Sequence, residues 1–190
     1  WEDAIKKEMN TVLVAFHILK EGAATPVGYN YMSCHMIFDC KQGTLQRKAR
    51  YVGDGHKVEE PDCSTYASVV SRESGQLAFL IAALNGLEIL AADAEGAYLN
   101  AKSREKLYTV CGPEFGEYEG RYAIIVRALY GTKSAAASWR ATISKVIEDL
   151  GFEMCKADNY VWMRKGLNAA DEKIWEYVLV YSDDLLAVAA

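Results

Sequence analysis

Residues 181–184, Tyr-Ser-Asp-Asp, place two carboxylates side by side between two apolar stretches. Residues 177–181 are β-branched and aromatic, and residues 185–190 are apolar, so the pattern predicts a β-hairpin with the aspartates at its tip. Adjacent carboxylates repel each other unless a cation lies between them. Divalent ions with oxygen ligands relieve that repulsion, and Mg²⁺ is the usual ion beside phosphates. A metal-free polar turn is the alternative interpretation, because Ser and Asp favour turns.

A third carboxylate, Asp93, follows the short apolar segment 87–92, which reads as a strand. Asp93 could simply cap the helix or turn expected at residues 94–101. Together with Asp183 and Asp184, however, it matches what a two-metal phosphoryl-transfer site requires. Carboxylates from separate strands hold two ions about 4 Å apart, which activate a 3′-hydroxyl and stabilise the pyrophosphate leaving group. The joint pattern therefore predicts nucleotidyl transfer more specifically than either motif alone.

The net charge of −5 is unusual for a protein that binds nucleic acid, because such proteins normally carry a basic face. Basic residues are nevertheless concentrated between positions 41 and 57, where a single acid, Asp54, stands among them. These basic residues are Lys41, Arg47, Lys48, Arg50 and Lys57. A solvated hairpin face is the alternative interpretation of this cluster.

The elements that must position these residues can be read from the periodicity. Helical spacing of apolar residues predicts an amphipathic helix at residues 1–13. Residues 32–40 and 45–52 alternate as strands around a turn at 41–43, which predicts a β-hairpin. Its second strand places Lys48 and Arg50 on one face and Arg47 on the other, since side chains alternate along a strand.

Farther along the chain, helices and strands follow one another without a repeat or a long linker. Ser71 or Ser74 can cap a helix that ends at Asn85-Gly86, and residues 134–150 form a second helix closed by Gly151. Further strands are expected at 87–92, 107–111, 123–126, 160–164, 174–181 and from 185 onward. Because these helices and strands do not alternate regularly, the pattern predicts an α+β fold.

The remaining composition excludes several classes of protein. The 190 residues suit one domain or two closely packed subdomains. The five cysteines and three histidines lack metal-ligand spacing, so we expect free thiols in a reducing compartment. No apolar run is long enough to span a bilayer, and no secretory signal is visible. Because the chain starts at Trp1 and stops inside an apolar run, we expect a piece of a longer protein.

In several ordered motifs the chain resembles the reverse-transcriptase domain of copia-type LTR retrotransposons over nearly its whole length. Residues 48–52 with Gly55 resemble the fingers motif, and residues 65–70 resemble a following T-F-A-P-V-V segment. Residues 93–100 resemble polymerase motif A, residues 129–139 resemble motif B, Gly151-Phe152 with Asp158 resemble a G-F…D segment, and residues 181–184 resemble motif C. The chain departs from the usual family residues at three positions: Gln76 stands where the family tends to have arginine, Ser134 where it usually has glutamine, and Ser182 where it usually has valine or another apolar residue.

The resemblance implies an α+β fold, a right-hand polymerase fragment made of fingers and palm. The fingers would comprise approximately residues 1–85 and 105–133, and the palm approximately 86–104 and 134–190. The palm would carry a ferredoxin-like antiparallel sheet with helices on one face. A thumb and an RNase H domain would be absent from these residues.

The resemblance also assigns roles to particular side chains. Asp93, Asp183 and Asp184 would be catalytic and would bind two Mg²⁺ or Mn²⁺ ions. Tyr98 would be the steric gate that favours deoxynucleotides. Lys48 and Arg50 would bind the nucleotide triphosphate together with Tyr98 and Ser134. The residues expected to contact nucleic acid are Lys41, Arg47, Lys57 and Tyr181.

The implied function is that of an RNA-directed DNA polymerase, with template-primer and deoxynucleotides as ligands. The rest of a Gag-Pol-type polyprotein, including integrase and RNase H, would be its partner, and no membrane is involved. The expected location is a virus-like particle in the cytoplasm, and the nucleus is the alternative location. Secretion is not expected. A catalytically silent domain that only binds nucleic acid or assembles is the alternative function. An RNA-dependent RNA polymerase is a weaker one, because the bulky Tyr98 disfavours ribonucleotides.

Overall fold

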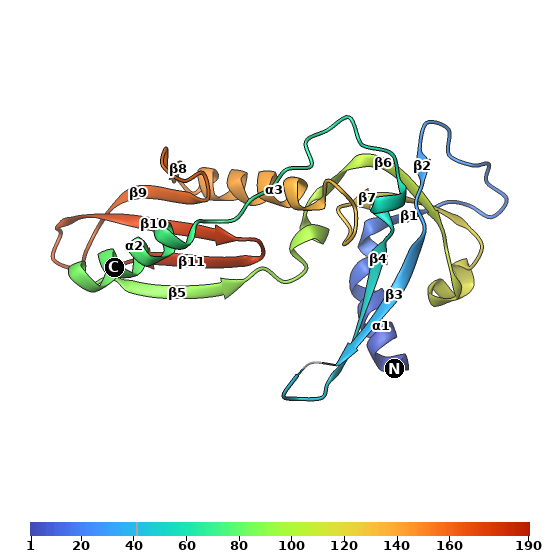
Figure 1. Ribbon diagram of the computed structural model, residues 1–190, viewed down its shortest axis with the longest axis horizontal. Coiled ribbons are helices and arrows are strands. Elements are labelled where there is room, and N and C mark those ends of the chain that lie inside the picture. The colour runs from blue at the N-terminus through green and yellow to red at the C-terminus, as the bar shows by residue number, and fades with distance from the viewer. Residues whose placement is uncertain (41) are drawn as a thin grey trace. The chain divides into compact units, whose positions relative to one another are not determined.

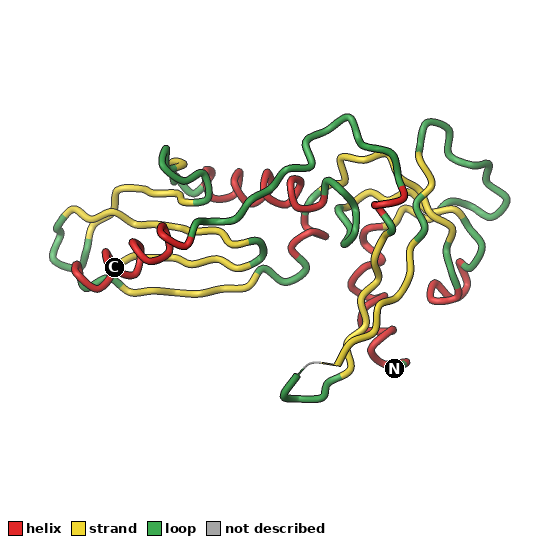
Figure 2. Tube along the Cα trace, viewed as in Figure 1, coloured by secondary structure: helices red, strands yellow, loops and turns green. Residues whose placement is uncertain are grey.

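The structure is a computed structural model that describes residues 1–40 and 42–190. The chain divides into two compact units. The first unit comprises Trp1–Tyr66 and Tyr98–Trp139, and the second comprises Ala67–Ala97 and Arg140–Ala190. Figure 1 labels the helices and strands, and Figure 2 distinguishes them from the loops. Each unit therefore combines segments that are far apart in the sequence.

In the first unit, helix α1 (Glu2–Val12) packs against strand β4 (Arg47–Gly53), which forms a hairpin with β3 (Cys34–Cys40). The predicted helix and hairpin are confirmed. A side chain links them, because the backbone N–H of Tyr51 donates a hydrogen bond of 2.9 Å to Oε1 of Glu8. The turn predicted at residues 41–43 includes Lys41, which lies outside the described residues.

A mixed sheet completes the first unit, with the strand order β1-β7-β6-β2. Its strands are β1 (Phe16–Ile18), β7 (Tyr122–Arg127), β6 (Lys102–Val110) and β2 (Asn30–Tyr31). Strand β2 runs parallel to β6, and the other neighbours are antiparallel. The inner face buries Phe16, Leu107 and Ile125 in one core with Tyr51 of the hairpin. Short 3₁₀ helices in this unit are η1 (Leu13–Ala15), η2 (Gly55–Lys57) and η4 (Pro113–Tyr118), and η3 (Ala97–Asn100) starts at the last residue of a second-unit segment.

The second unit is built on an antiparallel sheet with the strand order β5-β11-β10-β9-β8. These strands are β5 (Glu88–Asp93), β11 (Asp184–Ala189), β10 (Lys173–Tyr181), β9 (Val161–Leu167) and β8 (Glu153–Met154). The strands predicted around both aspartate motifs are therefore confirmed. Antiparallel strands with intervening helices also confirm the α+β class.

Helix α2 (Arg72–Asn85) covers one face of this sheet. Of the two caps that the sequence offered, Ser71 and Ser74, the structure has Ser71, whose hydroxyl accepts a hydrogen bond from the N–H of Ser74. The helix ends at Gly86, which has a φ of 62°. A left-handed residue at this position suits glycine, which lacks a Cβ. Two small residues, Ala78 and Ala82, bring the helix close to the sheet.

Helix α3 (Ala135–Asp149) ends at the other face of the sheet. Val161 packs in the cluster beneath α2, so Arg164 points to the opposite face because side chains alternate along β9. There Nη1 of Arg164 donates a hydrogen bond of 2.8 Å to the carbonyl of Leu150, directly after α3. This arrangement refines the expected palm, in which the helices were placed on one face. No helix in the described part of the chain is long and apolar enough to cross a membrane.

Candidate active site

The hairpin of β10 and β11 presents the two adjacent aspartates. Tyr181 pairs with Asp184, which leaves Ser182 and Asp183 as the turn. Ser182 has a φ of 58°, in the left-handed region that non-glycine residues rarely adopt. A β-branched residue is strained there more than serine, so Ser182 suits this turn better than the valine usual in the family. Strained residues of this kind often occur at functional sites.

Strand β5 brings the third aspartate to the same place. Asp93 pairs with Asp184 in the antiparallel register of β5 and β11. Residues directly opposite each other project from the same face of a sheet, so these two carboxylates are neighbours. The backbone N–H of Ala94 also donates a hydrogen bond of 2.8 Å to the carbonyl of Asp183, which ties the turn to the end of β5.

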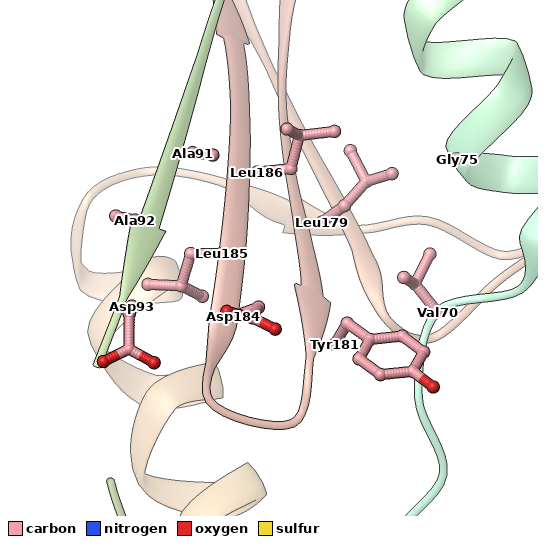
Figure 3. A pocket seen from close by; sticks show the side chains of 10 residues that line it. All are labelled: Val70, Gly75, Ala91, Ala92, Asp93, Leu179, Tyr181, Asp184, Leu185 and Leu186. Atoms are coloured by element: carbon pink, nitrogen blue, oxygen red, sulfur yellow. The ribbon is translucent and has the colours of Figure 1, made fainter. Parts of the chain in front are cut away.

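A cavity of about 420 Å³ lies against this end of the sheet. Figure 3 shows the side chains of Asp93, Asp184 and Tyr181 at one end, with leucine and alanine side chains farther along the strands. The lining residues are Val70, Gly75, Ala91, Ala92, Asp93, Leu179, Tyr181, Asp184, Leu185 and Leu186. The site therefore combines an apolar wall with acidic groups at its edge, all within the second unit.

The carboxylates at this edge provide oxygen ligands only. Asp93 and Asp184 are exposed, and neither forms an ion pair with any residue that the structure describes. Within the same residues, no group of three or more His, Cys, Asp or Glu side chains is arranged as a metal cluster. A Mg²⁺ ion in a nucleotide site is usually held by one or two carboxylates together with substrate phosphates. The pair formed by Asp93 and Asp184 fits that requirement.

The predicted basic residues lie on the hairpin of the first unit. Arg47 is on the face that packs toward α1, where its guanidinium lies 5.5 Å from the ring of Trp1. Lys48 is exposed on the opposite face, as alternation predicted, and Arg50 lies 3.9 Å from Asp39. Lys41, predicted to contact nucleic acid, lies outside the described residues.

Lys57 belongs to a polar cluster around Asp54. Its Nζ atom donates a 2.9 Å hydrogen bond to Asp54, whose carboxylate also accepts one of 2.6 Å from the hydroxyl of Ser33. The hydrogen bonds from Ser33 and Lys57 lower the pKa of Asp54 to about 2. Asp54 therefore remains charged at neutral pH and compensates the charge of Lys57.

Tyr98 and Ser134 are both placed in the first unit. The ring of Tyr98 is partly exposed and lies 4.8 Å from that of Tyr130. Ser134 is 1% exposed, so its side chain would reach a nucleotide only if this segment moved. Its backbone N–H donates a 2.7 Å hydrogen bond to Oε1 of Glu105. A carboxylate at a helix N-terminus satisfies an otherwise unpaired N–H, so Glu105 positions the start of α3.

Three glycines allow close backbone contact between the end of the β3–β4 hairpin and the loop that precedes α3. The N–H of Gly53 donates a 2.7 Å hydrogen bond to the carbonyl of Tyr130. A Cβ added at Gly131, where φ is 90°, would overlap the carbonyl oxygen of Gly53, and one added at Gly55 would overlap that of Gly131. The segments that resemble the fingers motif and motif B are therefore in direct backbone contact.

Asp158 ties the loop before β9 to the start of α2. Its carboxylate accepts hydrogen bonds from the N–H of Ser71 at 3.0 Å, from the hydroxyl of Ser74 at 2.7 Å and from the N–H of Tyr160 at 2.9 Å. Burial alone would raise the pKa of Asp158, but these hydrogen bonds outweigh it and lower the pKa below its ordinary value of 3.8. Asp158 thus holds the helix that lines the pocket.

We expect Asp158→Asn to lower the free energy of unfolding at neutral pH by about 2 kcal/mol, because an amide has one acceptor oxygen and leaves one donor group unsatisfied. A group with a lowered folded pKa stabilises the fold above its unfolded pKa, and that contribution is lost as the pH falls through the folded value. The difference between parent and variant should therefore shrink below about pH 4. Urea denaturation of parent and variant at several pH values would measure this difference in the free energy of unfolding.

The matched control is Asp171→Asn, at an exposed turn position with a φ of 60° that asparagine also tolerates. It should leave the stability within about 0.5 kcal/mol of the parent at every pH. Equal stability of the two variants at neutral pH would contradict the assigned role of Asp158.

Comparison with known families agrees with this architecture. The profile of the family described as reverse transcriptase (RNA-dependent DNA polymerase) matches residues 20–190. The chain therefore belongs to this reverse transcriptase family. It is 26% identical over 196 residues to the Retrovirus-related Pol polyprotein from transposon RE1 of Arabidopsis thaliana. The resemblance to copia-type retrotransposon polyproteins expected from the motifs is thus confirmed.

The alignment covers 98% of this chain and 13% of that relative. The chain therefore spans about an eighth of the length of that relative.

Proposed function

We propose that this chain is the fingers and palm of a reverse transcriptase that adds deoxynucleotides to a primer on an RNA template. The observation that carries the proposal is the pairing of Asp93 with Asp184 across β5 and β11, beside Asp183 in the turn. Carboxylates on separate strands at one edge are what nucleotidyl transfer with two metal ions requires. Family membership supports the same conclusion.

In this proposal the second unit is the palm and the first unit is the fingers. Helix α2 belongs with the palm, although the motifs placed residues up to 85 in the fingers, because it packs on the palm sheet. Asp93, Asp183 and Asp184 would hold Mg²⁺ or Mn²⁺, and the bound ions would supply positive charge that favours loss of the primer hydroxyl proton and departure of pyrophosphate.

The other proposed roles belong to the first unit and to the rim of the hairpin. Lys48 and Arg50 donate charge-assisted hydrogen bonds to the triphosphate. Tyr98 blocks the 2′-hydroxyl of ribonucleotides. Ser134 acts with Glu105 on the position of the loop before α3, since its side chain is buried. Arg47, Lys57, Lys41 and Tyr181 are the proposed contacts to template and primer.

The proposed setting is a Gag-Pol-type polyprotein with integrase and RNase H as neighbours, assembled in a cytoplasmic virus-like particle or acting in the nucleus. The Arabidopsis relative, a Pol polyprotein from a transposon, supports the polyprotein part of this proposal.

A catalytically silent, nucleic-acid-binding domain is the second candidate function. One observation favours it: Ser134 is buried where the family usually has glutamine. This candidate predicts binding of primer and template without turnover.

Primer extension on an RNA template separates the two functions. We expect addition of deoxynucleotides that requires Mg²⁺ or Mn²⁺ and stops when a chelator is added, with little use of ribonucleotides. The purified chain, and a longer protein that contains it, would be assayed with labelled primer. Salt-sensitive binding without extension in both proteins would favour the silent domain.

A further inference from the structure

The outer face of the β1-β7-β6-β2 sheet has no role in the proposed polymerase site. Burial alternates along β6, where Glu105, Leu107 and Thr109 are buried toward the core. Arg104 and Lys106 lie on the other, outer face and are exposed. This face belongs wholly to the first unit, whereas the carboxylate pocket belongs to the second.

Three tyrosine rings form a row across the outer face. Tyr31 of β2 pairs with Tyr108 of β6, and their ring centroids are 5.6 Å apart. Tyr108 in turn lies 5.7 Å from Tyr122 of β7. The rings reach solvent, since Tyr31 is 53% exposed and the other two are partly exposed. Aromatic rings on an open sheet are a surface on which nucleobases can stack.

The strands of this sheet carry more basic than acidic residues. The four strands carry two exposed cations on this face, Arg104 and Lys106. Their single acidic residue, Glu105, points inward and accepts the hydrogen bond from Ser134. The strands are therefore basic on their exposed side within a chain whose net charge is −5. Such cations beside aromatic rings complement a phosphate backbone.

We propose that this face binds single-stranded RNA, with bases stacked on Tyr31 and Tyr108 and phosphates bound by Arg104 and Lys106. Unpaired bases are required because a duplex hides the faces of its bases inside the stack. RNA is the assigned strand because the chain belongs to a family of RNA-dependent polymerases. The site acts without the metal-binding carboxylates, so it is independent of the proposed catalysis.

Fluorescence anisotropy with a labelled oligouridylate of about 12 nucleotides tests the proposal, with EDTA present to exclude metal-dependent binding. We expect Tyr31→Ala to weaken binding by about tenfold, since it removes one stacking surface. The double variant Arg104→Gln with Lys106→Gln should reduce the slope of log K against log salt by about 1.4, for two lost phosphate contacts.

Matched controls replace comparable side chains elsewhere on the surface. Tyr66→Ala removes a tyrosine that is 77% exposed, and Lys165→Gln with Lys173→Gln removes two exposed cations from the second unit. Both controls should bind the RNA as the parent does.

Equal affinity of Tyr31→Ala and the parent would overturn the proposal, as would absence of any salt-sensitive binding by the parent. Duplex RNA or single-stranded DNA whose binding weakens as much in Tyr31→Ala would also overturn it, because the surface would then not select unpaired RNA. A failure of primer extension would leave these binding results unaffected, so the two proposals can fail separately.

Discussion

Replacing Asp183 by asparagine is expected to reduce metal-dependent nucleotide addition by roughly 10³-fold or more. The amide preserves the size of the side chain and the polar turn, but it removes a negative charge next in sequence to Asp184, which pairs with Asp93. Divalent ions prefer charged oxygen ligands, so both the affinity for the ions and the stabilisation of the transition state should fall. Primer extension at several Mg²⁺ concentrations would measure the loss.

The control for this variant is Asp171→Asn, which makes the same chemical change at an exposed turn between β9 and β10. It should extend primers at the rate of the parent. Circular dichroism and thermal unfolding should show the same fold for both variants, because Asp183 forms no ion pair among the described residues. An Asp183→Asn protein that polymerises as well as the parent would refute the assignment of the catalytic site.

The second large effect is expected at Gly131, where Gly131→Ala should lower the free energy of unfolding by about 3 kcal/mol. The new methyl group would overlap the carbonyl oxygen of Gly53, and a backbone atom cannot rotate away as a side chain can. The φ of 90° adds conformational strain for any residue with a Cβ. Urea denaturation of the purified chain would measure the change.

Gly28→Ala separates the overlap from the strain. Gly28 has a similar φ of 79°, but no atom lies within 4 Å of the Cβ position. This variant should lower the free energy of unfolding by only about 1 kcal/mol, because backbone strain is its only effect. If Gly131→Ala proved as stable as Gly28→Ala, the proposed importance of the close backbone contact between Gly131 and Gly53 would be disproved.

Local features of the fold were predictable because they depend on neighbouring residues. Alternation placed Lys48 and Arg50 opposite Arg47 on β4, and the structure confirms those faces. Ser71 and Gly86 marked both ends of α2 through capping and left-handed backbone. In each case a short stretch of sequence contains the whole physical cause.

Pairings between distant segments could not be predicted from the same patterns. The two aspartate motifs were expected to meet, but no local signal states that Asp93 pairs with Asp184 in this register. The start of β6 was missed for a related reason. Residues 102–106 are all polar, and Glu105, which is buried, accepts a hydrogen bond from the backbone N–H of the distant Ser134. Such contacts depend on the finished fold.

The burial of Ser134 also depends on contacts between distant segments of the chain. The sequence shows only that a small polar residue stands where the family usually has glutamine. Its 1% exposure follows from packing of the loop before α3, with the Gly131 contact as part of that packing. A serine fits a closed interior position that a longer amide side chain would not occupy without rearrangement.

The register of β5, β11 and β10 has a consequence for the kinds of sequence change that this chain can accept. Side chains alternate along each strand, so a shift of one residue moves every side chain to the other face. Deleting a single residue within β5 would turn Asp93 away from Asp184, whereas losing two would preserve the face and move the carboxylate only along it. Gene copies that gain or lose an odd number of residues within β5 should therefore lose this carboxylate pair. That loss should come long before the apolar composition of the strands has changed.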